Sequence, residues 1–64
     1  MQFHIDNMTC GGCARSVTKA IQSVDPKAIV RTDPATRRVE IESATPADRF
    51  EDVLSEAGFP ARAA

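Results

Sequence analysis

The sequence predicts an α+β fold in which two helices cover one face of a four-stranded antiparallel sheet. Three observations lead to this prediction. The chain has only 64 residues, enough for a single domain over residues 1–64 with one small core. Its apolar residues alternate in some segments and recur at helical spacing in others, in the order β-α-β-β-α-β. Each helical segment has a single apolar face, so both helices are expected to pack on the same side of the sheet.

The first strand and the first helix flank a short loop. Phe3 and Ile5 alternate with polar neighbours and predict a half-buried strand. Residues 7–12 have no periodicity and include two glycines, so they are expected to form a loop. A helix is expected over 13–24, because Pro26 disfavours helical backbone in the residue before it. Its apolar residues have the i, i+3, i+4, i+7 spacing of one helix face; they are Val17, Ala20, Ile21 and Val24.

The middle of the chain predicts a β-hairpin. Over 28–32, Ala28, Val30 and Thr32 alternate with Ile29 and Arg31, and over 38–42 two apolar residues alternate with three charged ones. A period of two is typical of strands. The segment 33–37 between them begins with Asp-Pro and is expected to form the connection. At the end of the chain, residues 59–64 are expected to form a short edge strand. Pro60 weakens this strand, because proline cannot donate a hydrogen bond to its neighbour.

The second helix has both a start and a stop signal. Thr45 is expected to be its N-cap, with Pro46 at the first helical position and Asp48 in the first turn. Its apolar face again has helical spacing and consists of Phe50, Val53, Leu54 and Ala57. Gly58 is placed to end the helix with left-handed backbone. The complete order of elements predicts a two-layer, ferredoxin-like βαββαβ sandwich.

Composition and charge exclude several classes of protein. Eight basic and nine acidic residues leave a net charge of −1, so there is no general footprint for nucleic acid. No apolar run approaches the ~20 residues of a membrane span, and no secretory signal is recognisable. We therefore expect a cytoplasmic protein whose cysteines are reduced. The small core leaves no room for a large internal substrate pocket, so we do not expect an enzyme.

The charges are unevenly distributed along the chain. Residues 1–38 contain six Lys or Arg and three Asp or Glu, whereas residues 39–64 contain two and six. Such a dipolar surface suits electrostatic docking with another protein. A solvated surface without a partner could have the same distribution.

One segment contains residues that could bind a metal or react, and it lies where the first strand passes into the first helix. It reads Met8-Thr9-Cys10-Gly11-Gly12-Cys13. Two thiols three positions apart can face one ion if the intervening glycines keep the backbone flexible. The free N–H groups and positive dipole end of the helix favour thiolate over thiol at Cys13. Thiolate is both the nucleophile and the metal ligand.

The number of thiols narrows the choice of metal. Soft thiolates select Cu(I), Zn(II) or iron–sulfur clusters. Iron–sulfur clusters and structural zinc sites need four ligands. Asp6 and His4 are the candidate additions, but the strand pattern directs His4 away from the apolar face. Two thiolates alone suit low-coordinate Cu(I) best, with Hg(II) or Ag(I) as chemical mimics.

Two other uses of the cysteine pair compete with metal binding. A structural disulfide would close a four-residue loop, which stabilises a fold by only about 2 kcal/mol before strain. A small dithiol/disulfide oxidoreductase is the more serious alternative, because that motif also lies at a helix N-terminus. Such a protein would have a reduction potential near those of thioredoxins or glutaredoxins.

Residues around the pair have alternative roles. Met8 is either a third, thioether ligand or a plug of the core. Phe59 is either the hydrophobic contact of the helix end or a shield that keeps water from the metal. Arg15 and Lys19 lie four positions apart on the exposed side of the first helix, where they contact a partner or are simply solvated.

Met8-Thr9-Cys10-x-x-Cys13 within this pattern of elements resembles the heavy-metal-associated domain family, and within it the free-standing bacterial copper chaperones. The resemblance covers nearly the whole chain, including the Ala57-Gly58-Phe59 corner. It implies that Cys10 and Cys13 bind Cu(I). It also implies delivery of the metal to the metal-binding domain of a copper-transporting P-type ATPase, by thiolate exchange between two like sites.

The chain departs from the family pattern at a few loop positions. Asn7 stands where many members have glycine, and Arg37 replaces a common turn glycine. Phe59 stands where bacterial chaperones usually have tyrosine. Phenylalanine there is also common in regulatory domains attached to heavy-metal ATPases and in mercury-binding relatives, which are the remaining alternatives. The apoprotein is expected to be a monomer, and whether copper bridges two chains is left open.

Overall fold

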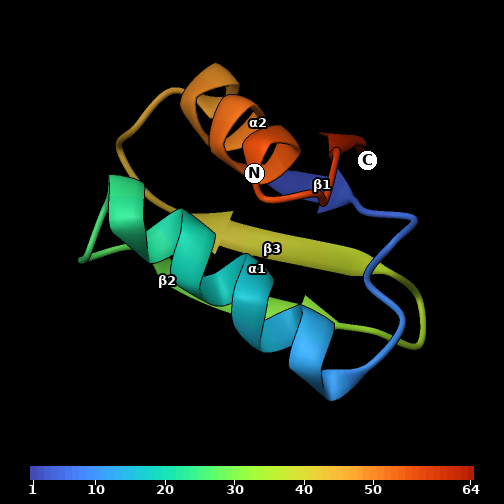
Figure 1. The fold of residues 1–64 in the computed structure, drawn as a ribbon. Helices are drawn as coiled ribbons and strands as arrows, with labels where there is room; N and C mark the ends of the chain where they lie inside the picture. Colours follow the sequence, from blue (N-terminus) through green and yellow to red (C-terminus); the bar gives the residue numbers. More distant parts are fainter.

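Six elements follow one another in the predicted order in the computed structural model, which describes all 64 residues. They are β1 (Gln2–His4), α1 (Gly11–Val24), β2 (Ile29–Asp33), β3 (Arg38–Glu42), α2 (Ala47–Glu56) and β4 (Arg62–Ala63). The strands form one sheet in the order β2-β3-β1-β4, and all neighbours are antiparallel. The predicted ferredoxin-like sandwich is therefore confirmed, and β4 is the short edge strand that the sequence predicts (Figure 1).

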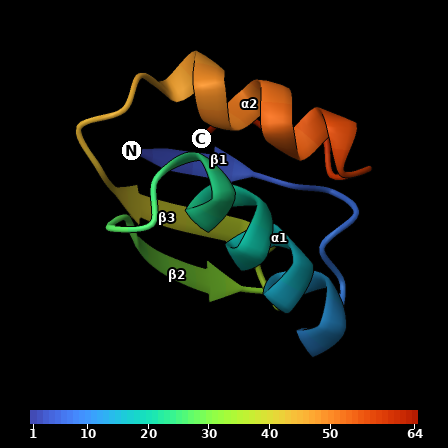
Figure 2. The ribbon, with the colours of Figure 1, turned by 60° about the vertical axis from the view of Figure 1, so that its left-hand side comes forward.

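One apolar core lies between the sheet and the two helices. It contains eleven buried side chains, contributed by strands, helices and the adjoining loops: Phe3, Ile5, Met8, Ala14, Val17, Ile21, Ala28, Val39, Ile41, Phe50 and Leu54. None of the buried residues is polar. Figure 2 shows α1 and α2 lying alongside the sheet, with the sheet's other face left open. Neither helix combines the length and apolar composition that a membrane crossing requires.

Strand alternation assigns charged side chains to the open face. In β3, Val39 and Ile41 are fully buried, and the three residues that alternate with them are exposed. The register pairs Arg31 with Glu40 and Asp33 with Arg38 across β2 and β3. The sheet is consequently apolar on one side and charged on the other, as a two-layer fold requires.

Both helices begin differently from the prediction. α1 begins at Gly11 rather than Cys13, with Cys10 as its N-cap. α2 begins at Ala47, and its N-cap is Pro46 rather than Thr45. Pro46 has an extended backbone with ψ of 145° and accepts a hydrogen bond through its carbonyl from the Arg49 N–H. The proline is thus the last extended residue before the helix, not the first helical one.

The end of α2 confirms the role predicted for Gly58, which has a φ of +88°. Its N–H donates to the Ser55 carbonyl, and the Phe59 N–H donates to the Leu54 carbonyl at 2.8 Å. These two bonds form a Schellman motif, which satisfies the free carbonyls of the last turn. Ala57, predicted on the apolar face, is exposed because it is the C-cap, where the chain leaves the helix.

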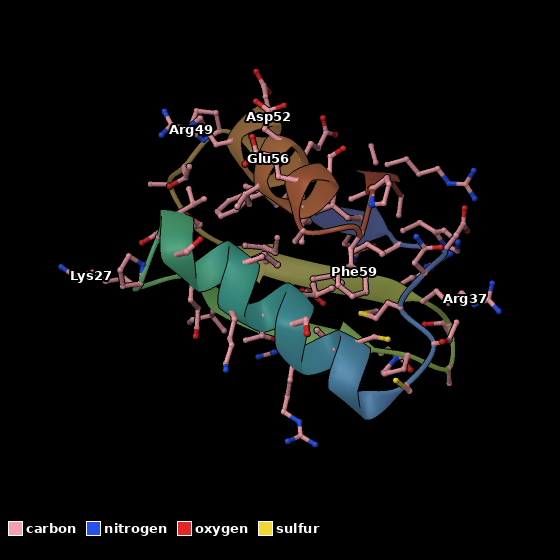
Figure 3. The ribbon with its side chains drawn as sticks, viewed as in Figure 1. Lys27, Arg37, Arg49, Asp52, Glu56 and Phe59 are labelled. Carbon is pink, nitrogen blue, oxygen red and sulfur yellow. The ribbon has the colours of Figure 1, made fainter.

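The β2–β3 hairpin supports the start of the loop between β1 and α1. Arg37 has a φ of 60°, the only non-glycine residue with positive φ. Its carbonyl accepts a hydrogen bond from the Ile5 N–H at 2.8 Å, just after β1 ends. The hairpin and the β1–α1 loop therefore lie at the same end of the molecule, where Figure 3 shows Arg37 pointing into solvent.

Candidate metal centre

The loop between β1 and α1 is anchored by Met8. The Met8 N–H donates to the Ile5 carbonyl at 3.2 Å, which closes a turn around Asp6 and Asn7. The Met8 side chain is fully buried and belongs to the core. Of its two predicted roles, core plug is the one that this burial supports. The loop that follows begins from a fixed point.

The two cysteines converge at the beginning of α1. Cys10 is the N-cap and has an extended backbone, and its carbonyl accepts the Ala14 N–H at 3.0 Å. Cys13 lies in the first helical turn. The two sulfur atoms are 3.2 Å apart and form no disulfide. Cys10 is exposed, whereas Cys13 is half-buried and packs against the core.

The glycines between the cysteines are part of regular helix. Gly11 and Gly12 belong to α1, and neither has a positive φ. A Cβ atom built on Gly11 would meet nothing within 4 Å, and one on Gly12 would lie 3.9 Å from the Cys10 sulfur. The loop predicted over residues 7–12 therefore ends at Cys10, and the two glycines lie in the first turn of α1 instead. The thiols meet because Cys10 is the N-cap and Cys13 the third helical residue, two positions whose side chains lie close together at a helix start.

The start of the helix acts on Cys10. The nearby N–H of Cys13, followed by the Cys13 thiol and the Gly12 N–H, holds the pKa of Cys10 below its ordinary value. Cys10 makes no complete capping hydrogen bond, so this is stabilisation by N–H groups that face the sulfur without ideal geometry. Sequence analysis assigned the helix effect to Cys13. The N-cap position of Cys10 is what places its sulfur before the free N–H groups.

No third ligand joins the pair. The structure contains no cluster of three or more His, Cys, Asp or Glu side chains able to hold a metal. His4, one of the candidate additions, has its Nε2 atom 2.7 Å from Asp6 Oδ1. Asp6 also lies 3.7 Å from the Arg62 guanidinium. Both candidate additions are therefore engaged with each other, and the two thiols are the candidate donors that remain.

The one surface hollow lies away from this loop, on the open face of the sheet. Its lining includes His4, Arg31, Arg38, Asp33 and Glu40, but neither cysteine. Only one of its nine lining residues is hydrophobic. Because both basic and acidic groups line it, the hollow presents no single charge to a ligand. The thiol pair therefore remains the candidate functional site.

The corner between α2 and β4 is tied to the β1–α1 loop. The side-chain amide of Asn7 donates to the Gly58 carbonyl at 3.2 Å, across 51 residues of sequence. Phe59, the next residue, is half-buried and packs against the core. In the view of Figure 3 it lies between α1 and the C-terminal end of α2, with sulfur atoms drawn beside it. Sequence reasoning noted Asn7 only as a departure from glycine and did not foresee this contact.

The remaining predicted residues are on the surface. Thr9 is exposed in the loop, and Arg15 and Lys19 are exposed on α1. Neither cation is in an ion pair. α1 contains no acidic residue, so its exposed side is positively charged.

The fold and the site together define a small metal-binding domain, with an exposed dithiol at the start of the first helix of a ferredoxin-like sandwich. The heavy-metal-associated domain matches residues 2–60 of the sequence. The chain belongs to the heavy-metal-associated domain family, as its resemblance predicts. The comparison with curated proteins found no match.

Solved structures with the same fold include a gold-binding protein and a copper chaperone. A gold-binding protein is 56% identical, with a TM-score of 0.94, over 97% of this chain and 95% of its own. The copper chaperone Atx1 from Synechocystis PCC6803 is 31% identical, with a TM-score of 0.93, over 97% and 98%. Atu1203 from Agrobacterium tumefaciens is 35% identical, with a TM-score of 0.85, over 94% of both chains. The chain is thus similar over nearly its whole length to solved proteins that include a gold-binding protein and a copper chaperone.

Proposed function

We propose that this protein is a Cu(I) metallochaperone, a carrier and not an enzyme, which holds one ion between Cys10 and Cys13. The observation that carries the proposal is the isolated, exposed dithiol, which has no third ligand. Soft monovalent ions accept two thiolates, whereas zinc and iron–sulfur sites need more donors. The lowered pKa of Cys10 favours the thiolate form, which is the form that binds a metal. The reducing cytoplasm, where we place the protein, would keep both thiols free.

Exchange of the ion follows from low coordination. A thiolate of an incoming partner adds a third sulfur bond to the bound Cu(I). One of the two original Cu–S bonds then breaks, and the released thiolate keeps the electron pair of that bond. Exposed Cys10 is the residue that a partner reaches first, while half-buried Cys13 is held by the core. No oxidation or reduction is involved.

The proposed recipient is the metal-binding domain of a copper-transporting P-type ATPase, which carries a similar dithiol. The basic side of α1, with Arg15 and Lys19, lies beside the cysteines and has no acidic residue. It would attract a partner with acidic groups near its own thiols. Transfer should then slow as ionic strength rises, because salt screens the attraction between exposed charges.

Au(I) is a second candidate cargo. It is favoured by one observation, the 56% identity to a gold-binding protein over nearly the whole of both chains. Au(I) is, like Cu(I), a soft monovalent ion that suits two thiolates. The dithiol itself does not separate the two ions, so the metal has to be decided by competition.

The test is an anaerobic titration of the reduced protein with Cu(I) against a chromophoric chelator, with Au(I) and Zn(II) in parallel. We expect one Cu(I) per chain, bound tightly enough to compete with the chelator, and weak binding of Zn(II). Preferential retention of Au(I) from an equimolar mixture of Cu(I) and Au(I) would indicate that the cargo is gold instead of copper. The His4→Ala variant is the matched control, since it removes the only imidazole, on the open face of the sheet, and should bind as the wild type does.

Failure to hold either monovalent ion would refute the carrier proposal. The alternative, a dithiol oxidoreductase, would then be supported by disulfide reductase activity and by a reduction potential in the range of thioredoxins and glutaredoxins. Retention of Zn(II) in preference to Cu(I) would contradict the proposal equally, because two thiols alone would then not be the complete donor set.

A further inference from the structure

We propose that Asn7 is a positioning residue that acts as a clasp on the metal loop and limits the rate at which the ion enters and leaves. The clasp is the hydrogen bond from the Asn7 side-chain amide to the Gly58 carbonyl, 3.2 Å long. It joins the β1–α1 loop, which leads into the cysteine pair at the start of α1, to the corner that carries Phe59. This inference rests on the proposed carrier function.

The clasp lies between two segments that are otherwise fixed. On the loop side, the Met8 side chain is buried, and its N–H is bonded to the Ile5 carbonyl. On the corner side, the Phe59 N–H is bonded to the Leu54 carbonyl within the Schellman motif. Asn7 is the only side chain that donates a hydrogen bond between these two segments. Its loss would therefore free the Gly58–Phe59 corner from the loop and weaken, without abolishing, the backbone hydrogen bond that anchors each segment.

Binding of a metal ion between the thiols requires the two sulfur atoms to move apart. The sulfur atoms are 3.2 Å apart in this structure. If about 2.3 Å, the metal–sulfur bond of zinc thiolates, is taken as a guide, a linear S–metal–S unit spans about 4.6 Å. A linear S–metal–S unit therefore requires Cys10 and Cys13 to move apart by more than 1 Å. Cys10, exposed at the N-cap, is the cysteine that packing restrains less, because Cys13 packs against the core. Cys10 is three residues from the clasp, which holds the loop in the closed arrangement.

The size of the effect follows from the strength of one exposed hydrogen bond. A hydrogen bond of ordinary net strength changes the ratio of the closed to the open form about two- to tenfold. If opening of the clasp precedes both loading and release, its loss accelerates both steps by the same factor. The equilibrium dissociation constant then stays the same, which separates a gate from a contact that merely stabilises the bound state.

The experiment compares the wild type with Asn7→Ala and Asn7→Asp. The aspartate keeps the shape of the side chain but has no N–H to donate. Loading of the reduced protein with Cu(I), and release of Cu(I) to excess chelator, are followed anaerobically by stopped flow at high salt, so that the added charge is screened. We expect both rates to rise about two- to tenfold in both variants, with an unchanged dissociation constant. Gln22→Ala, which removes an exposed amide at the far end of α1, should behave as the wild type.

A second measurement needs no metal. Amide hydrogen exchange of the apoprotein should be faster at Phe59 and Met8 in both Asn7 variants, while amides in β3 and in the middle of α1 are unchanged. Faster amide exchange without metal binding would uphold the clasp and refute the carrier function alone. Unchanged loading and release rates, or a changed dissociation constant with an unchanged loading rate, would refute the gate. Unchanged amide exchange at both residues would refute the clasp itself.

Discussion

At the scale of single residues, the two cysteines are not equivalent. Cys10 is exposed and lies at the N-cap, where the Cys13 N–H lowers its pKa. Cys13 is half-buried against the core. In the proposed carrier, Cys10 is therefore the thiol that a partner would reach first, and Cys13 the one that the core would hold in position.

Replacing either cysteine by serine should lower Cu(I) affinity by orders of magnitude, because a single thiolate remains. Cys10→Ser should leave the free energy of unfolding within about 0.5 kcal/mol of the wild type, since the side chain is on the surface. Competition with a chelator measures the affinity, and urea unfolding measures the stability. Wild-type affinity in either single variant would contradict binding by both thiols.

At the scale of elements, the ends of the helices position the site. α1 begins where the β1–α1 loop ends, and α2 ends at the corner to which that loop is tied. The two glycine-containing helix ends differ in their backbone. Gly58 has a φ of +88°, whereas Gly11 has no positive φ and lies in the first turn of α1.

Gly58→Ala should therefore destabilise the protein, and Gly11→Ala should stabilise it. A side chain at Gly58 meets no atom within 4 Å, so the cost of about 1–2 kcal/mol comes from left-handed backbone alone. A side chain at Gly11 is equally unobstructed. Alanine there should raise the free energy of unfolding by about 0.5–1 kcal/mol, because it restricts the unfolded chain. Urea unfolding of the matched pair checks both signs. A stabilising Gly58→Ala would mean that the α2–β4 corner is not held in this conformation.

A second clasp joins the elements at the opposite end of the molecule. Asp25, the C-cap of α1, accepts hydrogen bonds from the Ser43 hydroxyl and the Lys27 N–H. Ser43 in turn accepts the Thr45 N–H. The hydrogen bonds hold the pKa of Asp25 below its ordinary value, that of the Ser43 hydroxyl being the largest cause. The carboxylate thus connects the end of α1 to the segment that leads into α2.

This clasp should make stability depend on pH in the acid range. Because the pKa is lower in the folded than in the unfolded protein, folding favours the ionised form. The contribution is complete above the unfolded pKa, about 3.9, and is lost as pH falls through the folded pKa. Urea unfolding at a series of pH values should show a shallower acid loss in Asp25→Asn than in the wild type. Asp52→Asn, which removes an exposed carboxylate without such hydrogen bonds, is the control, and identical acid profiles in the two variants would contradict the prediction.

At the scale of the whole molecule, the sheet and both helices pack around a single core of eleven residues. A chain of 64 residues has a stability of about 3–10 kcal/mol. The thiol loop is joined to this core through Met8 and Cys13. The charges are also separated at this scale, with the exposed acids Asp52 and Glu56 on α2, and none on α1 (Figure 3).

Leu54→Ala should consequently bring the protein close to unfolding. Leu54 is fully buried, and such a truncation costs about 2–5 kcal/mol. Ile29→Ala is the matched control, because Ile29 is 53% exposed on the open face of the sheet. Its cost should be within about 0.5 kcal/mol. Comparable losses of unfolding free energy in the two variants would contradict the position of the core.

The sequence by itself determined the order and type of all six elements, the single core and the candidate dithiol. These depend on local signals: the period of Val39 and Ile41 in a strand, of Val17 and Ile21 in a helix, and the spacing of the two cysteines. Helix starts were less well determined, because the N-cap position of Cys10 or Pro46 depends on one backbone angle that several residues can adopt. The helical glycines were misjudged for the same reason, since glycine permits many conformations and specifies none.

Only the tertiary structure decided how the site is held. The separation of the sulfur atoms and the facing of Cys10 toward the N–H groups depend on where α1 begins, whereas the clasp from Asn7 to Gly58 does not follow from any local pattern. The physical reason is that a hydrogen bond between residues 51 positions apart exists only after the sheet and both helices have packed. Local periodicity predicts which segments fold and which faces they bury, whereas contacts between their ends depend on where packing places those ends.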